Sequence, residues 1–379
     1  MSLLRFAPYV VKTVWRARMR SGLTVLGTAL ALAMFAFVRT LEGGVEALRS
    51  SAATPTLVVF QQSRFCPLTS ELPLRYKAEI LRVEGVAAVL PVLLFVNACR
   101  SNLDLVTLHG IDPAALDAVE PVTLVAGDLT SWWGVSTGAI VGKRLAERRK
   151  LSPGDELRLG NVDVRVSGIF DAAGAGLDNV AFVHQEQLQT ARGLRGKATQ
   201  FNVRLKLGAD PAGVAREIDR RFAADEAPTD TKTMQAFVQG AVGEVAGIVS
   251  FARLLGWLAV CVVVLVLGNT VFISAQTRAA ELGTLEAVGL PKTSLATLLL
   301  AESCLLALVG GAIGTGLVVL WFHLKPTTLG VEGFGIDFVA GLPVLTAGLV
   351  ASLAVGVLAA LGPVVEALRR PLDVAVKAV

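Results

Sequence analysis

The stretch LLGWLAVCVVVLVLGNTVFISAQT at residues 254–277 decides the fold, because it carries no charged side chain over a length that can cross a bilayer. Three further uncharged runs occupy residues 21–38, 303–322 and 338–365. A spanning helix needs roughly 20 mainly apolar residues, and its backbone polar groups must be satisfied within the segment. The sequence therefore predicts an α-helical membrane protein with four transmembrane helices. One precedes and three follow a large α+β extracytoplasmic domain (1+3 topology).

The composition supports this class. Hydrophobic residues make up 53% of the chain and charged residues only 17%, whereas soluble domains carry about 25% charged residues. The net charge of +4 is small, and the basic residues gather beside the apolar runs. Membrane lipids are therefore expected partners, and nucleic acid is not.

The short flanks predict the orientation. The segment before the first run contains basic residues and no acidic one: Arg5, Lys12, Arg16, Arg18 and Arg20. Basic residues also follow the last run, at Arg369, Arg370 and Lys377. Because short cytoplasmic loops are enriched in Lys and Arg, both termini and the loop near 278–294 are placed in the cytoplasm. The expected location is a bacterial inner membrane with the large domain in the periplasm.

A cleaved signal peptide is the alternative for the first run. Its apolar region is long, and Val38-Arg39-Thr40-Leu41-Glu42 lacks the small residues of a cleavage site, so an uncleaved span is favoured. The resulting division is cytoplasmic 1–20, first span 21–41, periplasmic domain with stalk helices 42–247, second span 248–275, cytoplasmic coupling segment 276–294, third span 295–322, periplasmic loop 323–337, fourth span 338–362 and cytoplasmic tail 363–379.

The segment between the first two spans alternates short β-branched runs with Gly, Pro and Asp. Strands are predicted at 56–60, 86–96, 105–110, 162–170, 180–184 and 201–207. Helices are predicted at 74–83, 143–149, 185–191 and 211–222. The amphipathic stretches 41–48 and 237–248 are interpreted as stalk helices that continue the spans, with capping helices of the soluble core as the alternative.

Two features of this domain allow two interpretations each. Cys66 and Cys99 are its only cysteines; they form a disulfide in an oxidising compartment or remain buried thiols. Trp132-Trp133 is either a contact surface or, on a strand, a pair with one ring in the core.

The residues indicate no catalytic chemistry. The three histidines, His109, His184 and His323, are far apart in sequence, and no G-x-x-x-x-G-K-[ST] motif is present. The chain is therefore expected not to be an enzyme and to hold no metal or other cofactor. ATP and Mg²⁺, if used, belong to a partner ATPase.

The apolar runs contain few polar groups. Gly310 and Gly314 form a small-residue pair, and Gly348, Ser352 and Gly356 form a ladder. Such spacing favours close helix packing over a pore lining, within the chain or between two copies. Glu302 is the exception, and an intramembrane carboxylate is either functional or solvated near the interface.

The segment TRAAELGTLEAVGLP at 277–291 predicts a short amphipathic helix from about Thr277 to Val288, ending at Gly289-Leu290-Pro291. Such a helix suits a partner's groove, and a membrane-surface turn is the alternative. Its candidate coupling residues are Thr277, Arg278, Glu281, Leu282, Gly283, Leu285, Glu286, Ala287 and Gly289.

This segment resembles the coupling region of the MacB/FtsX/LolC family of ABC transporter permeases, N-x(4)-S-x(3)-R-x(2)-E-x-G-x(3)-A-x-G. The matching residues, in order, are Asn269, Ser274, Arg278, Glu281, Gly283, Ala287 and Gly289. Further similar pieces are Trp15-Arg16, Glu302-Ser303 and Gly310-Gly311, and, in the periplasmic domain, Gly110-Ile111-Asp112-Pro113. The fused nucleotide-binding domain of MacB itself has no counterpart here.

The resemblance implies a permease that forms a homodimer and binds a separate cytoplasmic ABC ATPase at 278–289. ATPase closure would be relayed mechanically to the periplasmic domain. The leading expectation is export of a substrate, with a periplasmic adaptor protein and an outer-membrane channel as possible further partners. The alternatives are a lipoprotein-releasing permease of the LolC/E type and a non-transporting, FtsX-like regulator of a cell-wall hydrolase.

Overall fold

The computed structural model describes residues 7–51, 56–64, 67–98, 105–116, 122–172, 177–325, 327–331 and 334–369. It divides into two compact units. The helical unit comprises Met1–Glu42, Gly247–Lys325 and Val339–Val379, and the α+β unit comprises Gly43–Ala246 and Pro326–Phe338.

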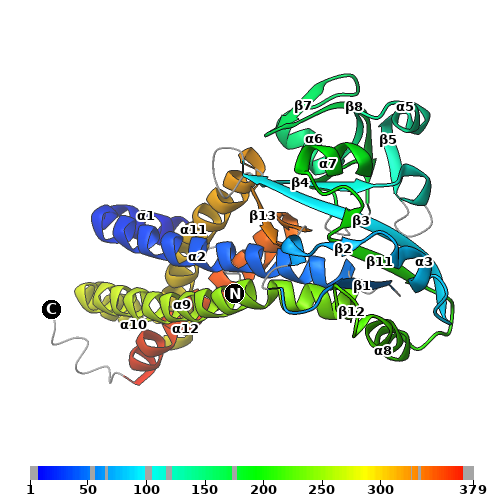
Figure 1. The fold of residues 1–379 in the computed structure, drawn as a ribbon. Coiled ribbons are helices and arrows are strands. Elements are labelled where there is room, and N and C mark those ends of the chain that lie inside the picture. Colours follow the sequence, from blue (N-terminus) through cyan, green and yellow to red (C-terminus); the bar gives the residue numbers. More distant parts are fainter. Residues whose placement is uncertain are drawn as a thin grey trace. The chain divides into compact units, whose positions relative to one another are not determined.

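The helical unit is built from α1 (Ala7–Arg16), α10 (Ala279–Ala287), α11 (Lys292–Leu324), α12 (Leu342–Arg369) and parts of α2 (Arg18–Ser51) and α9 (Met234–Thr277) (Figure 1). Within the described residues, four helices are long and apolar enough to cross a membrane, over Arg18–Ser50, Val245–Thr277, Lys292–Leu324 and Leu342–Arg369. The expectation of four such helices is confirmed.

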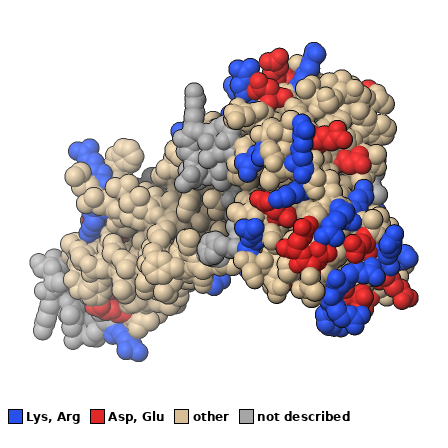
Figure 2. All heavy atoms as spheres, viewed as in Figure 1, with Lys and Arg blue, Asp and Glu red and all other residues tan. Residues whose placement is uncertain are grey.

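Apolar side chains occupy both the inside and the outside of the helical unit. Leu267, Val271 and Ala307 are fully buried in its core, whereas Leu265 and Val350 are largely exposed. A helix that is apolar on every side suits a lipid environment. On the face shown in Figure 2, charged residues cover the α+β unit densely and are sparse over the long helices.

The α+β unit contains a ten-stranded sheet in the order β12-β1-β11-β3-β4-β9-β6-β8-β5, with β7 paired to β8. Its strands are β1 Thr56–Gln61, β3 Val86–Ala98, β4 Leu105–Ile111, β5 Thr123–Gly127, β6 Gly138–Gly142, β7 Glu156–Leu159, β8 Val162–Asp171, β9 Val180–His184, β11 Gln200–Leu205 and β12 Thr229–Thr233. Two further two-stranded sheets pair β2 (Leu72–Pro73) with β10 (Lys197–Ala198) and β13 (Thr327–Val331) with β14 (Phe334–Phe338).

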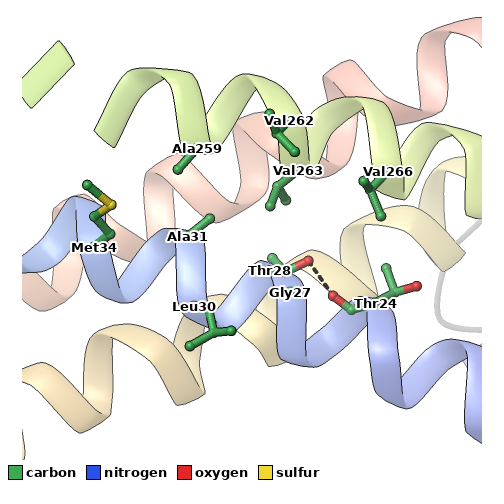
Figure 3. A pocket seen from close by; sticks show the side chains of 10 residues that line it. All are labelled: Thr24, Gly27, Thr28, Leu30, Ala31, Met34, Ala259, Val262, Val263 and Val266. Atoms are coloured by element: carbon green, nitrogen blue, oxygen red, sulfur yellow. Dashed lines mark hydrogen bonds between the residues drawn. The ribbon is translucent and has the colours of Figure 1, made fainter. Parts of the chain in front are cut away.

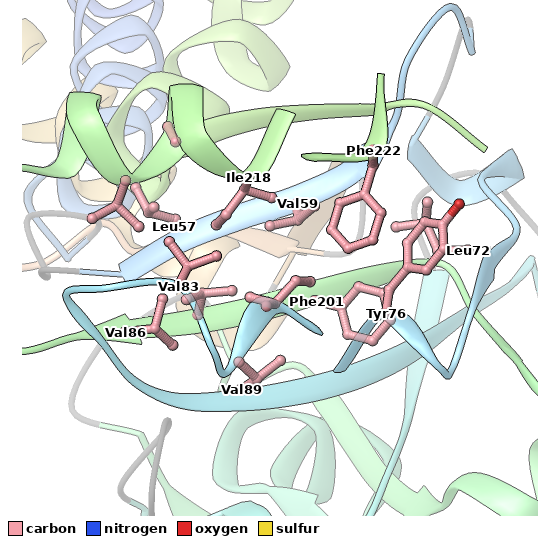
Figure 4. Packing of buried hydrophobic residues seen from close by; sticks show 14 of the residues in the cluster. Leu57, Val59, Leu72, Tyr76, Val83, Val86, Val89, Phe201, Ile218 and Phe222 are labelled. Carbon is pink, nitrogen blue, oxygen red and sulfur yellow. The ribbon is translucent and has the colours of Figure 1, made fainter. Parts of the chain in front are cut away.

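Strand β3 is long enough to serve two hydrophobic cores. Its first part pairs with β11, up to Val92 opposite Gln200, and its second part pairs with β4, from Leu93 opposite Gly110. Figure 4 shows the first core, in which Tyr76 of α3 (Tyr76–Ile80) stacks on Phe222 of α8 (Pro211–Phe222) at 4.0 Å between ring centroids.

The second core lies on the other part of the sheet. Val141, Val164 and Ala181 from the strands pack with Leu145 of α6 (Lys143–Arg149) and Leu188 of α7 (Gln185–Arg192). Local capping signals account for where such helices begin. In α8, for example, Asp210 caps the first turn by accepting hydrogen bonds from the backbone N–H groups of Ala212 and Gly213, and Pro211 occupies the first position.

All six predicted strands and all four predicted helices of this domain occur, with shifted ends. The helix expected at 74–83 is shorter, because regular α-helix is confined to Tyr76–Ile80. Strands β5, β6, β7 and β12 were not predicted: they are short, and β12 is entirely polar in sequence, TDTKT. Trp132 and Trp133 lie on helix α5 (Leu129–Gly134), not on a strand; Trp132 is buried and Trp133 exposed.

The segment 323–337, expected to be a loop, contains the β13–β14 hairpin, which belongs to the α+β unit. Phe338, expected to begin the fourth span, ends β14, and α12 begins at Leu342. The predicted stalk helices correspond to unbroken helix: α2 continues to Ser51, and α9 starts at Met234. Cys66 and Cys99 lie outside the described residues, so their pairing stays a prediction.

Candidate functional site

Glu302 is a carboxylate buried inside the helical unit. It lies on α11 and is only 5% exposed. Ser274, near the end of α9, donates a hydrogen bond to Glu302 Oε1 at 2.9 Å, and Arg278 Nη1 donates to Glu302 Oε2 at 3.2 Å. Because a buried charge is costly unless it is paired and hydrogen-bonded, these two partners hold α9 and α11 together at this level.

Arg278 extends the pair towards the surface. Its Nε lies 3.5 Å from Glu281 Oε2, and Arg16 of α1 approaches Glu281 Oε1 at 3.1 Å. The Arg16–Glu281 pair is exposed and contributes little stability on its own. The chain Glu302–Arg278–Glu281–Arg16 nevertheless joins α11, the α9–α10 junction, α10 and α1 in one polar network.

The backbone around Arg278 explains this geometry. The expected continuous helix from Thr277 to Val288 is divided: Thr277 ends α9, Arg278 has non-helical angles of φ −113° and ψ 15°, and α10 covers Ala279–Ala287. This break separates α10 from α9 at the arginine. The helix ends as expected at Gly289, whose φ of +100° is accessible to glycine.

The other predicted coupling residues line this short helix. Gly283 is buried, Glu286 lies 3.8 Å from Lys292 Nζ, and the side chains of Leu282, Leu285 and Ala287 lie outside the described set. Thr284 is exposed, and Val288 is 85% exposed. Val288 thus leaves an exposed apolar side chain at the end of α10, which is suited to contact with another protein.

The predicted small-residue positions are sites of close approach within the chain. A Cβ added at Gly310 would lie 2.7 Å from Thr28 of α2, and one at Gly314 would overlap the backbone of Ala29. A Cβ at Gly356 would lie 2.8 Å from the Cα of Cys304 on α11, and one at Gly348 would overlap Thr315. Ser352 packs against Gly311 in the same way.

A second polar cluster holds the β13–β14 hairpin inside the α+β unit. Arg144 Nε of α6 lies 3.0 Å from Asp337 Oδ2, Asn179 donates to Asp337 Oδ1, and Arg148 donates to Thr328 at 2.8 Å. Burial raises the pKa of Asp337 above its ordinary value, and the nearby Arg144 offsets this only in part.

Sequence reasoning did not identify this hairpin cluster, because Asn179 and Asp337 lie far apart in segments with no motif. It did name Arg278, Glu281 and Glu302, but did not connect Glu302 with the coupling segment. No three His, Cys, Asp or Glu side chains among the residues that the structure describes are grouped to hold a metal ion.

Comparison with known proteins gives two domain matches. Residues 21–221 match the MacB-like periplasmic core domain, and residues 253–372 match the FtsX-like permease C-terminal domain. No curated protein gives a match.

Solved structures also match about half of this chain. The extracellular domain of the noncanonic ABC-type transporter YknZ from Gram-positive bacteria is 18% identical, with 47% of this chain and 99% of that chain covered and a TM-score of 0.37. The periplasmic region of MacB from Actinobacillus actinomycetemcomitans is 11% identical, with 50% and 94% covered and a TM-score of 0.39. With scores of this size, the assignment rests on the two domain matches, and by these the chain belongs to the MacB/FtsX-like family of ABC transporter permeases.

Proposed function

We propose that this chain is the permease subunit of an ABC transporter and that a separate cytoplasmic ATPase binds it at α10. Permeases of this family are not themselves catalytic and work with an ATPase partner. ATP and Mg²⁺ would therefore be held by that partner. Four spans in 1+3 order would place both termini and α10 in the cytoplasm and the α+β unit outside.

The buried contact of Glu302 with Arg278 and Ser274 carries this proposal. A docking helix transmits force only if it is fixed to the helices that must move. Arg278 stands at the start of α10, and its guanidinium is tied to α11 through Glu302. Displacement of α10 by closing ATPases would therefore displace the cytoplasmic ends of α9 and α11 together.

Helix continuity supports transmission along the chain. α9 runs without interruption from Met234 to Thr277, and residues of this helix belong to both units. The β13–β14 hairpin supplies another covalent connection, because it joins α11 to α12 and belongs to the α+β unit. Motion started at α10 would thus reach the α+β unit through α9 and through this hairpin.

Export of a substrate from the periplasmic side is the leading function, by a homodimer that recruits an adaptor protein and an outer-membrane channel. Lipoprotein release and control of a cell-wall hydrolase use the same mechanics. Purification with native partners separates the three: an adaptor supports export, a lipoprotein receptor supports release, and a hydrolase supports control.

The docking surface is tested with Val288→Asp, which places a charge on the exposed end of α10. Leu207→Asp is the matched control, because Leu207 is fully exposed in the α+β unit. Each tagged variant is expressed with its neighbouring genes, purified from membranes, and the amount of bound ATPase is measured by quantitative mass spectrometry.

Val288→Asp should lose most of the ATPase, because burying an unpaired carboxylate in an interface is costly, while Leu207→Asp should retain it. Arg278→Glu, which places a second carboxylate beside Glu302, and Gly283→Pro, which interrupts α10, should lose it as well. Full ATPase recovery with all of these variants would refute docking at α10.

A further inference from the structure

A cavity of about 590 Å³ lies between α2, α9 and α12 within the helical unit. This volume is in the range of pockets that hold small organic ligands. Most of its lining is apolar: Phe35, Val38, Gly256, Trp257, Val350 and Ala354. Phe35 and Trp257 meet edge to face at 6.1 Å between ring centroids, which gives the cavity one aromatic wall.

One end of this cavity is charged. Arg39 Nη1 lies 3.0 Å from Glu42 Oε2, and Arg253 Nη1 lies 3.6 Å from Glu42 Oε1. Two guanidinium groups thus share one carboxylate, which leaves an excess positive charge at the rim. The Arg39 and Arg253 side chains are 53% and 57% exposed. Both are therefore accessible to a further anionic partner.

The position of these arginines is unusual for a membrane protein. In the proposed orientation, Arg39 and Arg253 stand at the outer ends of their spans, whereas Lys and Arg are enriched on the cytoplasmic side. Topology therefore does not account for them. Their convergence on one glutamate at the mouth of an apolar cavity points instead to binding.

A second cavity, of about 390 Å³, lies between α2 and α9 (Figure 3). Residues 24–34 of α2 and 259–266 of α9 line it. Its hydroxyl groups already have partners: Thr28 donates to the carbonyl oxygen of Thr24, and Thr24 donates to that of Arg20. Side chains such as Leu30, Met34 and Val262 leave it an apolar surface suited to hydrocarbon.

We propose that these cavities bind an anionic phospholipid of the outer leaflet. Its phosphate group would lie between Arg39 and Arg253, and an acyl chain would lie along α2 and α9. Charge complementarity favours this occupant, because the apolar walls end in a net positive rim. The inference rests on the proposed function in one respect: the proposed orientation of the chain determines that the outer leaflet supplies the lipid.

The test uses the full chain in a neutral detergent and native mass spectrometry. Phosphatidylglycerol and phosphatidylcholine with identical acyl chains are added in equal amounts, and the ratio of bound lipids is measured. The variant is Arg39→Gln with Arg253→Gln. Its matched control is Arg158→Gln with Arg220→Gln, which removes the same charge from exposed arginines of the α+β unit.

Wild type and control should prefer phosphatidylglycerol. In the Arg39/Arg253 variant this preference should fall about fivefold per arginine, which is the effect expected of one cation near anionic lipid.

Val350→Trp, which fills the cavity from α12, should reduce binding of both lipids. An unchanged lipid ratio in the Arg39/Arg253 variant overturns the proposal. So does a disulfide cross-link between two copies of the Val350→Cys variant, because it would place a second chain at the cavity. ATPase recovery is scored in the same preparations, so loss of lipid preference and loss of coupling are distinguished.

Discussion

Replacing Arg278 with methionine removes the cation that neutralises Glu302 and keeps an unbranched side chain of similar length. Glu302 is 5% exposed and accepts bonds from Arg278 and Ser274. After the substitution its carboxylate keeps only the serine among the hydrogen bonds described. Breaking a buried ion pair by removing one partner costs about 3–5 kcal/mol.

The serine contributes less by the same reasoning. Ser274→Ala removes one hydrogen bond to a charged group, worth about 1.5–3 kcal/mol, and leaves the ion pair in place. Replacing both partners, with Arg278→Met and Glu302→Leu, should recover most of the stability lost in Arg278→Met, because apolar replacement of a buried pair is often neutral.

The four proteins are purified in the same detergent, and unfolding is followed by intrinsic fluorescence during a thermal scan. The expected order of melting temperature is wild type, then Ser274→Ala, then Arg278→Met, with the double variant close to wild type. A double variant that melts at or below the temperature of Arg278→Met would refute the reasoning, since removing Glu302 as well would then have relieved no unpaired buried charge.

Three further outcomes are expected. Gly314→Leu should destabilise the protein by about 1–3 kcal/mol, because its side chain overlaps the Ala29 backbone; Gly316→Leu, which meets nothing within 4 Å, is the control, and equal thermal melts would contradict close packing at Gly314. Phe222→Ala should cost about 3–5 kcal/mol because Phe222 is fully buried, whereas Leu207→Ala at an exposed site should be neutral in the same melt. Burial holds the pKa of folded Asp337 above its ordinary value. Its native state therefore binds more protons, so its stabilising contribution is complete below about pH 4 and is lost as the pH rises through the raised pKa. In the Asp337→Asn variant, the melting temperature should lose this part of its dependence on pH across the same range. A slope equal to that of the wild type would contradict the assignment.

The long helices could be predicted from the sequence because their signal is local. Residues 254–277 contain no charge, and the lipid requirement for internal hydrogen bonding leaves few alternatives to a helix. The β1 and β9 strands were likewise visible as β-branched runs. By contrast, β12 consists of Thr, Asp and Lys, and its place at the sheet edge depends on pairing with β1, a contact between segments distant in sequence.

The candidate site was predicted in composition but not in geometry. The spacing Ser274, Arg278, Glu281 identified the coupling segment, and Glu302 was noted as an intramembrane acid. Their convergence depends on how α9 and α11 pack, which no short-range pattern encodes. The β13–β14 hairpin was missed for the same reason: its partners Arg144 and Asn179 come from an earlier part of the chain.

Strand β3 has a consequence for how the α+β unit melts. Side chains on its first part, such as Val89, belong to one core, and Leu93 belongs to the other. Successive residues of a strand face opposite sides, so a shift by a single position would misplace both sets at once. Neither half can lose its order while the other keeps a full complement of neighbours. Amide protons on both sides of Val92 should therefore exchange with the same free energy of opening. The two halves of the sheet would unfold as one cooperative unit and not as two separate domains.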